Sequence, residues 1–439
     1  MPRERNSDEL IIAFHQGEPF AIDAETRRRH LHLIGQTGTG KTTLLKHLIA
    51  QDLRAGRGVA VIDPLGGLAQ AVLKLVPASR THDVFYLDAN NLSRPVAFNV
   101  LDEPDPDRHA TTADDVVAAF VHIFGPEAVG DRSQQVLRNS VRALLDTPAA
   151  TLLCIPKLLT HEAYRARVVR RVRDPVVRDY WTNQFANYDD RFRLEVTAPL
   201  LNKLDSLLSA PALRNIVGQP HSSIDLRRSM HEGRIVIINL SKGAFGERNA
   251  HLLGALIVTK FAQAAFARAA LPQHRRRPFY LYADEFQDYA SAGFTRILSQ
   301  ARAFALSLTL AHQFLGQLSE EQRQAAFGNA ASFLSLRVGA EDAPLIAQHL
   351  GLDPEIEHAG LGTHEIAPEK RLIGLPNFTA FARFLIGDTP TEPLYLKLLP
   401  DPDDINHHPE KVVAASANRF GRDRAVVEDK IRRFLSRDL

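Results

Sequence analysis

A nine-residue stretch near the N-terminus, GQTGTGKTT at 35–43, has residue types and spacing suited to binding phosphate groups. It matches the pattern G-x-x-x-x-G-K-[ST], in which glycines let successive backbone N–H groups turn inward toward phosphate oxygens. We expect Lys41 to reach the β and γ phosphates of a nucleoside triphosphate and the Thr42 hydroxyl to take one position around Mg²⁺. The predicted nucleotide-binding residues are Gly35, Gln36, Thr37, Gly38, Thr39, Gly40, Lys41, Thr42 and Thr43.

Two adjacent carboxylates, Asp284 and Glu285, follow the apolar run FYLYA at 279–283. In P-loop enzymes a second strand ends in an aspartate that helps to hold Mg²⁺, and we assign this role to Asp284. Glu285 is then placed to polarise a water molecule for attack on the γ-phosphate, as a general base. The alternative is a solvated turn, but a complete phosphate loop in the same chain favours catalysis. The sequence therefore predicts a Mg²⁺-dependent ATPase.

Polar residues also follow the apolar segment LSLTLA at 306–311. Gln313 is predicted to hydrogen-bond the attacking water or the γ-phosphate, with helix capping or a surface position as the alternative. His312 is interpreted as a structural residue. Asp63 ends another apolar run, VAVID, and either lies at the same edge of the sheet or belongs to a turn; the sequence leaves both open.

The strands expected to carry these residues are short apolar runs, typical of parallel strands covered by helices on both faces. They are residues 31–35, 59–63, 83–88, 234–240, 279–284, 306–311 and 332–338. The phosphate loop directly follows the first of them and directly precedes the helical segment TTLLKHLIAQDL, as phosphate binding requires. Two further β-like segments, TAFARFLI and PLYLKLL, come after residue 370.

Helical periodicity dominates the middle of the chain, from about 105 to 230, with few strand signals. The predicted fold class is therefore α/β: a P-loop NTPase motor domain with a mainly parallel sheet and an inserted all-α domain. We expect the first part of the nucleotide-binding domain at 1–104, the insertion at 105–230, the second part at 231–400, and a charged helical tail at 401–439.

The overall composition restricts the class of protein more than its partners. The 439 residues carry 53 Lys and Arg against 51 Asp and Glu, so net charge neither requires nor excludes nucleic acid. Cys154 is the only cysteine, which excludes an internal disulfide and a cysteine-rich zinc site. The N-terminus lacks the features of a secretory signal, and no uninterrupted apolar run approaches the roughly 18 residues that span a bilayer. We expect a cytoplasmic protein that reaches the inner face of the membrane only through partners.

Several motifs in this order carry a family resemblance: the phosphate loop, YLYADEFQDYA, SQARAFALSLTLAHQFLGQL and GNAASFLSLRVGAEDAPLIAQHL. Over roughly residues 25–400 the chain resembles the TraD/TraG coupling proteins of type IV secretion, within the HerA/FtsK group of DNA-pumping ATPases. The resemblance implies a RecA-like motor domain, a homo-hexameric ring, and an all-α insertion near the ring entrance. It also implies coupling of ATP hydrolysis to movement of single-stranded DNA, with an attached relaxase, toward a secretion channel.

The sequence departs from the family pattern in three ways. Many members begin with transmembrane helices, and we expect none in this sequence, so membrane anchoring is open. Many soluble relatives read DPHGD where this chain has DPLGG, with Leu65 and Gly67 in place of His and Asp. The C-terminal tail offers no clear partner-binding motif.

A ring ATPase commonly takes an arginine from the neighbouring subunit to stabilise the transition state. Arg302 and Arg337 both lie near strand boundaries and are the two candidates, with Arg337 slightly preferred. A surface salt bridge is the alternative role for each.

Two basic runs are candidates for contact with DNA phosphates. RARVVRRVRD at 165–174 lies in the helical insertion, where Arg167, Arg170 and Arg171 would share one helix face. A solvated helix face is the alternative, and HRRRP at 274–278 is expected to be a loop. Without a base-reading motif, DNA binding should be tolerant of sequence and sensitive to salt.

Two other functions stay open on the sequence alone. One is a double-stranded DNA pump of the HerA or FtsK kind. The other is a nucleotide-binding receptor or scaffold that recruits substrate proteins without moving DNA; the intact Lys41, Asp284 and Glu285 argue against it.

Overall fold

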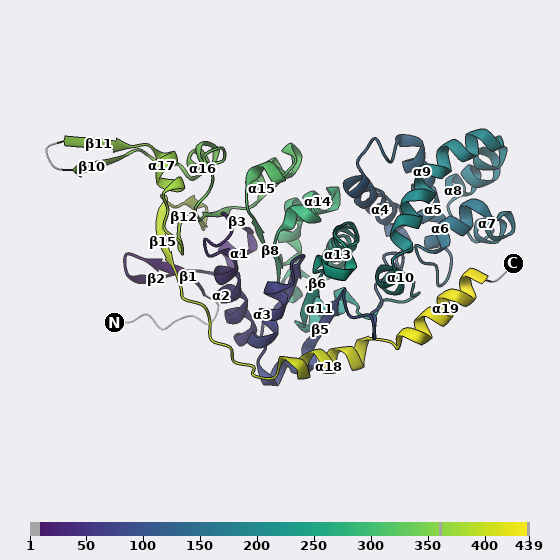
Figure 1. Ribbon diagram of the computed structural model, residues 1–439, viewed down its shortest axis with the longest axis horizontal. Coiled ribbons are helices and arrows are strands. Elements are labelled where there is room, and N and C mark those ends of the chain that lie inside the picture. The colour runs from purple at the N-terminus through teal and green to yellow at the C-terminus, as the bar shows by residue number, and fades with distance from the viewer. Residues whose placement is uncertain (1–8, 360–361, 437–439) are drawn as a thin grey trace.

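The centre of the molecule is a twisted mixed β-sheet flanked by helices. The computed structural model describes residues 9–359 and 362–436, and within them an 11-stranded sheet has the order β2-β1-β15-β12-β9-β3-β8-β7-β4-β6-β5. Figure 1 shows helices on both faces of this sheet, a helical region at one end, and the antiparallel pair β10 (Glu355–Ala359) and β11 (Gly362–Ile366) at the other.

Strands β3 to β9 pair in parallel, as the apolar runs predicted. They are β3 (Leu31–Ile34), β4 (Gly58–Asp63), β5 (Val84–Asp88), β6 (Ile235–Asn239), β7 (Phe279–Ala283), β8 (Leu306–His312) and β9 (Ser332–Ser335). The phosphate-loop strand β3 lies between β8 and β9, and β7 lies between β8 and β4. The carboxyl ends of β3, β8, β7 and β4 therefore meet along one edge of the sheet.

The strands on the other side of β9 run antiparallel to their neighbours. They are β12 (Thr379–Arg383), β15 (Leu394–Leu398), β1 (Leu10–His15) and β2 (Glu18–Ile22). The sequence prediction missed β1 and β2, which form a hairpin through Gln16 and Gly17, both with positive φ (51° and 88°). Two consecutive positive φ values are typical of a type I′ hairpin turn.

Alternate residues of the central strands face two separate hydrophobic cores. Val59 and Val61 pack with helices α2 (Lys41–Arg54) and α3 (Gly67–Leu75). Ala60 and Ile62 face the opposite side, with α13 (Glu247–Ala267) and α14 (Ala292–Gln300). Burial on both faces explains why these strands read as continuous apolar runs.

Within the described part of the chain, one helix is long and apolar enough to cross a bilayer. It begins at Glu247 and includes α13, and 78% of its most apolar 18-residue stretch is buried inside the molecule. We interpret α13 as the core helix of the motor domain. Polar residues such as Lys260 interrupt it, so it does not appear as an uninterrupted apolar run.

A long helical segment joins β5 to β6, as predicted. Its helices are α4 (His109–Phe124), α5 (Asp131–Leu145), α6 (Cys154–Thr160), α7 (Glu162–Val169), α8 (Pro175–Asp179), α9 (Asp190–Leu208), α10 (Pro211–Val217) and α11 (Leu226–Glu232). Helix α4 is bound to the motor side, because Asp115 accepts hydrogen bonds from Arg296 of α14 (2.8 and 2.9 Å). The division of the chain into domains stays a prediction.

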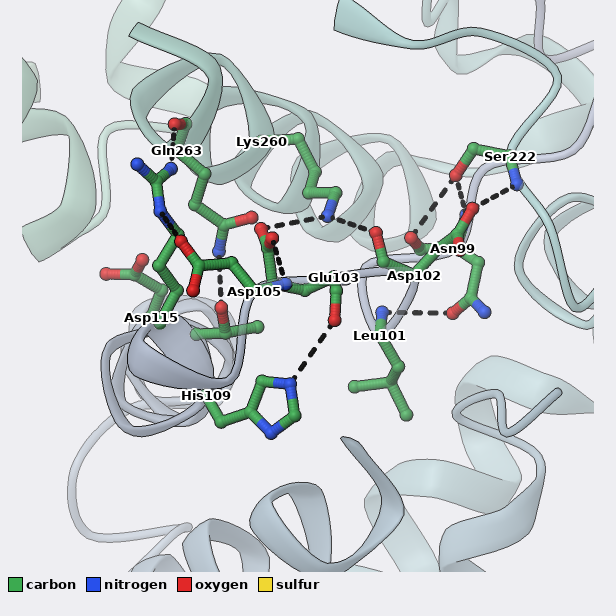
Figure 2. A network of polar contacts seen from close by, with 12 residues as sticks. Asn99, Leu101, Asp102, Glu103, Asp105, His109, Asp115, Ser222, Lys260 and Gln263 are labelled. Atoms are coloured by element: carbon green, nitrogen blue, oxygen red, sulfur yellow. Dashed lines mark hydrogen bonds and ion pairs between the residues drawn. The ribbon is translucent and has the colours of Figure 1, made fainter. Parts of the chain in front are cut away.

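The two connections of the helical segment are fixed to each other and to α13 (Figure 2). Lys260 of α13 donates to the Asp102 carbonyl (2.9 Å) and lies 3.9 Å from the Glu103 carboxylate. The Ser222 N–H of the returning connection donates to the Asp102 carboxylate (2.9 Å), and Asn99 donates to the Pro220 carbonyl (2.7 Å). Both connections of the helical segment are therefore held at one point on the motor domain.

Residues 399–436, here called the C-terminal belt, run along the surface from the sheet to the helical segment (Figure 1). The belt contains α18 (Pro409–Phe420) and α19 (Arg424–Ser436), the helices expected in the charged tail. Ser416 accepts a hydrogen bond from the backbone of Tyr86 in β5 (2.8 Å), and Glu428 accepts one from Asn215 of α10 (3.2 Å). The belt therefore contacts both the motor domain and the helical segment.

The remaining helices and strands are short. They are α1 (Ala24–Arg28), α12 (Lys242–Phe245), α15 (Glu320–Asn329), α16 (Ala343–Leu350), α17 (Pro368–Ile373), β10 (Glu355–Ala359), β11 (Gly362–Ile366), β13 (Leu385–Ile386) and β14 (Thr389–Pro390).

Candidate active site

The phosphate loop connects β3 to α2 in the arrangement that the sequence predicted. Gly38 and Gly40 have φ values of 80° and 119°, which glycine adopts without strain, and Lys41 begins the helix. The Lys41 ammonium donates to the carbonyls of Gly35 and Gln36, and the side chain is only 7% exposed. The loop therefore folds around this ammonium group.

Close packing explains the glycine at the start of the loop. A Cβ on Gly35 would lie 2.6 Å from the Cβ of Leu336, closer than such atoms approach in proteins. The Thr39 hydroxyl donates to the Gln36 carbonyl (2.6 Å) and closes the loop from within. Thr42 is exposed in the first turn of α2, where its hydroxyl can bind a ligand.

Three carboxylates gather at the ends of β4 and β7, beside this ammonium group. Asp284 and Glu285 follow β7 and Asp63 ends β4, and each is less than 8% exposed. Burial raises the pKa of Asp284 to about 7, reinforced by the charges of Asp63 and Glu285 and opposed by Lys41. Burial lowers the pKa of Lys41, opposed by Glu285 and Asp284. The cluster therefore carries more negative than positive charge.

A chain of hydrogen bonds links Glu285 to the phosphate loop. Gln313, at the end of β8, donates to Glu285 (2.8 Å) and accepts from the Thr37 hydroxyl (3.0 Å). Glu285 itself has φ 43° and ψ 52°, a left-handed conformation that non-glycine residues adopt at a cost of about 1–3 kcal/mol. The structure thus brings together Glu285, Gln313 and the loop, which the sequence had placed at strand ends far apart in the chain.

Two polar residues of this site were not assigned from the sequence. Gln287 donates to the second carboxylate oxygen of Glu285 (2.9 Å). Asp63 accepts from the backbone N–H groups of Leu65 (2.8 Å) and Ala69 (2.8 Å), so its carboxylate also fixes the DPLGG turn. The position of Asp63 after an apolar strand was the available signal, but only the pairing of β4 with β7 shows that it lies beside Asp284.

The donor set fits a Mg²⁺ ion that is held mostly by phosphate and water. Mg²⁺ usually binds one or two protein oxygens together with substrate phosphates. No group of three or more His, Cys, Asp and Glu residues among the described positions is arranged to hold a metal by itself. Asp284 and the Thr42 hydroxyl are the two oxygen ligands expected from the sequence, and the excess negative charge around Asp284 would be offset by a cation.

The two candidate arginines lie on different parts of the motor domain. The Arg337 carbonyl accepts from the Gln36 N–H (2.9 Å), and its guanidinium donates to the Leu375 carbonyl (3.4 Å). Arg337 therefore borders its own phosphate loop. Arg302 is exposed just before β8, at the opposite edge of the sheet. Of the two, only Arg302 lies away from the phosphate loop of its own chain.

A buried histidine pair lies in β3 and β8, next to the edge of the sheet that carries the candidate site. The Nε2 atoms of His32 in β3 and His312 in β8 are 2.7 Å apart, and both side chains are fully buried. The Nδ1 of His312 lies 3.2 Å from the Phe314 carbonyl, so Nδ1 must carry the proton. His32 then donates from Nε2 to His312, and both rings are neutral. Burial of His312 supports its interpretation as a structural residue, which stays a prediction.

These histidines are expected to make the fold sensitive to acid. Burial lowers the pKa of His312 to about 3 and that of His30 to about 4, and lowers the pKa of His32 far below its usual value. The unfolded chain takes up protons below about pH 6.5, whereas the folded chain does not until lower pH. The contribution of each such histidine to the free energy of unfolding is therefore fully present above about pH 6.5. Below about pH 6.5 it falls by about 1.4 kcal/mol per pH unit.

Urea unfolding between pH 7 and pH 5 measures this effect. The variant His32→Gln keeps a donor to His312 but removes one titrating group, so its stability should fall less steeply with pH. Equal slopes for the variant and the wild type would contradict this account of the pair.

A scan against protein-family models identifies the family. Residues 15–362 match the type IV secretion-system coupling protein DNA-binding domain. The chain belongs to the type IV secretion-system coupling proteins. The matched range includes the phosphate loop, both carboxylates and Gln313, and it confirms the family resemblance seen in the sequence.

Solved structures agree with the fold of this coupling protein. The plasmid coupling protein TrwB in complex with ADP and Mg²⁺ is 16% identical, with a TM-score of 0.65 over 93% of this chain and 92% of that chain. TrwB with a non-hydrolysable ATP analogue gives 0.65 at 16% identity over 92% of each chain. VirB4 of Thermoanaerobacter pseudethanolicus gives 0.59 at 13% identity over 91% of this chain and 98% of that chain. No curated protein matches.

Proposed function

We propose that this coupling protein hydrolyses ATP with Mg²⁺ and uses the energy to pass DNA, with its relaxase, toward a type IV secretion channel. The observation that carries the proposal is the hydrogen-bonded path from Thr37 of the phosphate loop through Gln313 to Glu285. The complexes of TrwB with ADP and Mg²⁺ and with an ATP analogue support nucleotide binding by the same fold.

In the proposed reaction each residue at the edge has one task. The loop N–H groups and the Lys41 ammonium bind the phosphates, and Thr42 and Asp284 would hold the magnesium ion, which offsets phosphate charge when bound. Glu285 takes a proton from the attacking water. Gln313 orients Glu285 with one end of its side-chain amide and contacts Thr37 with the other end. A change at the phosphates can therefore reach β8.

The basic run at 165–174 is a weaker DNA candidate than its composition suggested. Helix α7 ends at Val169, so Arg170 and Arg171 lie in the turn that follows it and not in the helix itself. Arg165 donates to the carbonyls of Leu158 and Leu159 (3.2 Å each). Arg167, Arg170 and Arg171 remain exposed, and we propose them as sequence-tolerant phosphate contacts.

The second basic run, at 274–278, serves the fold. Arg276 donates to the carbonyls of Leu271 (2.9 Å) and Ala303 (2.6 Å), and Arg277 donates to that of Glu232 (2.7 Å). These bonds fix the loop before β7, and we do not place DNA there.

The assembly is proposed to be a homo-hexameric ring that contacts the membrane only through its partners. In such a ring Arg302, exposed at the sheet edge opposite the phosphate loop, is the candidate to reach the nucleotide of a neighbouring copy. Arg302→Ala should then bind ATP normally but lose turnover, whereas normal turnover would exclude it.

The proposed DNA dependence is tested by ATPase stimulation. We expect single-stranded DNA to raise turnover more than duplex DNA, and stimulation to fall steeply between about 50 and about 200 mM salt, because phosphate contacts release counterions. Arg170→Ala with Arg171→Ala should weaken this stimulation and reduce its salt dependence. Lys430→Ala with Arg432→Ala, an equal charge change at exposed positions of the belt, is the control.

The outcome also separates the alternatives. Stronger stimulation by duplex DNA would favour a double-stranded DNA pump. Unstimulated turnover, unchanged across this salt range, would favour a nucleotide-binding receptor without pumping.

A further inference from the structure

The geometry of the phosphate loop fixes which way a bound nucleotide must point. This argument rests on the proposed ATPase function. The γ-phosphate belongs near Glu285 and Gln313, on the side of β8 and β7. Because β3 lies between β8 and β9, the base must lie on the other side, toward β9, β12 and β15.

Phe378, which directly precedes β12, is the unusual residue on that side. Its φ is 61°, a left-handed conformation that is rare for a bulky residue, and its side chain is 46% exposed. Its N–H donates to the Thr39 carbonyl of the phosphate loop (2.8 Å), and its carbonyl accepts from Leu398 at the end of β15 (2.8 Å). Both backbone groups thus hold an exposed aromatic ring in a disfavoured conformation.

The ring lies directly against the loop. A Cβ on Gly40 would be 3.0 Å from the Phe378 ring carbon Cδ1 and 3.0 Å from a methyl carbon of Leu398. The start of the C-terminal belt closes the same side of α2: Asp401 contacts Thr43 and pairs with Lys46. The exposed ring is therefore placed next to the first turn of α2, beyond the end of the loop that binds phosphates.

We propose that Phe378 is the platform on which the nucleobase of the bound nucleoside triphosphate stacks. Exposed rings that bind bases contribute by stacking, which is worth about tenfold or more in affinity and is insensitive to the identity of the base. Backbone strain held by two hydrogen bonds is typical of residues that are positioned for a ligand. The site would therefore hold nucleotides by the ring faces of their bases, and ATP and GTP should bind with similar affinity.

Tryptophan fluorescence tests the proposal without relying on turnover. Trp181, the chain's single tryptophan, is buried in the helical segment, so Trp181→Phe gives a dark background. In that background Phe378→Trp should lose emission when ATP or GTP is added, because a base stacks on the indole. Inorganic tripolyphosphate, which has no base, should bind without this change. Emission that responds equally to tripolyphosphate would overturn the proposal.

Affinity gives a second and independent measurement, by calorimetry. Phe378→Leu should weaken ATP binding about tenfold and leave tripolyphosphate binding unchanged, whereas Phe378→Tyr should bind ATP like the wild type. Tyr395→Leu removes an aromatic ring of equal exposure (46%) in β15 and is the matched control. A Phe378→Leu protein that binds ATP as the wild type does would overturn this proposal while leaving the ATPase function intact. A wild-type protein that binds neither ATP nor tripolyphosphate would overturn both.

Discussion

Replacing Glu285 with Gln is expected to lower kcat for ATP hydrolysis by about 10²-fold to 10⁴-fold while ATP still binds. The amide cannot take a proton from water, and general bases contribute rate enhancements of this size. The amide can still hydrogen-bond Gln313 and Gln287, so the strained turn after β7 should survive the change. Steady-state phosphate release and equilibrium ATP binding, measured on the same preparation, separate the two effects.

Glu321→Gln is the matched control, because this glutamate is exposed in the first turn of α15 and touches none of the site. It should hydrolyse ATP at the wild-type rate. If Glu285→Gln also stayed within about threefold of the wild type, the assignment of the general base would be wrong, and the nucleotide-binding receptor without pumping would gain support.

Replacing Lys41 with Ala is expected to weaken ATP binding and to lower turnover by at least about a hundredfold. The ammonium group is the positive charge within the loop, and removing a group that stabilises developing charge costs about 10²–10³ in rate. Its loss would also remove a donor from the Gly35 and Gln36 carbonyls, although the Gln36 carbonyl would keep the Thr39 hydroxyl. Lys41 opposes the rise in the pKa of Asp284. Without Lys41 we therefore expect the pKa of this carboxyl to rise further above about 7.

Arg54→Ala, at the exposed end of the same helix, controls for a loss of one positive charge. It should bind and hydrolyse ATP normally. Lys41→Ala binding ATP with wild-type affinity would show that the phosphates do not lie in this loop.

The sequence was sufficient to predict the parallel strands and the residues at their ends. Apolar runs buried on both faces, followed by Lys41, Asp284 and Gln313, locate the edge of the sheet where the candidate site lies. The order of the strands was not predictable, because sheet neighbours are set by tertiary packing. Without that order Asp63 stayed undecided, and the bond from Thr37 to Gln313 had no signal at all.

Local backbone conformation was the other feature that could not be predicted from the sequence. The arginine run at 165–174 looked continuous with a helix, but α7 ends at Val169, and Arg170 and Arg171 lie in the turn that follows. The β12 and β15 segments were recognised by composition, yet the left-handed turn at Phe378 depends on bonds to Thr39 and Leu398, from distant parts of the chain. Such contacts are visible only once the sheet is assembled.

The position of β3 within the sheet has a consequence for the synthesis of the protein. Leu31 pairs with Thr309 on one side and with Ser332 on the other, so the strand that carries the phosphate loop has no neighbour until most of the chain has left the ribosome. During that time an apolar segment waits unpaired, which favours aggregation and slow folding. A nascent chain that ends before residue 306 would contain the whole phosphate-binding motif and still bind no nucleotide.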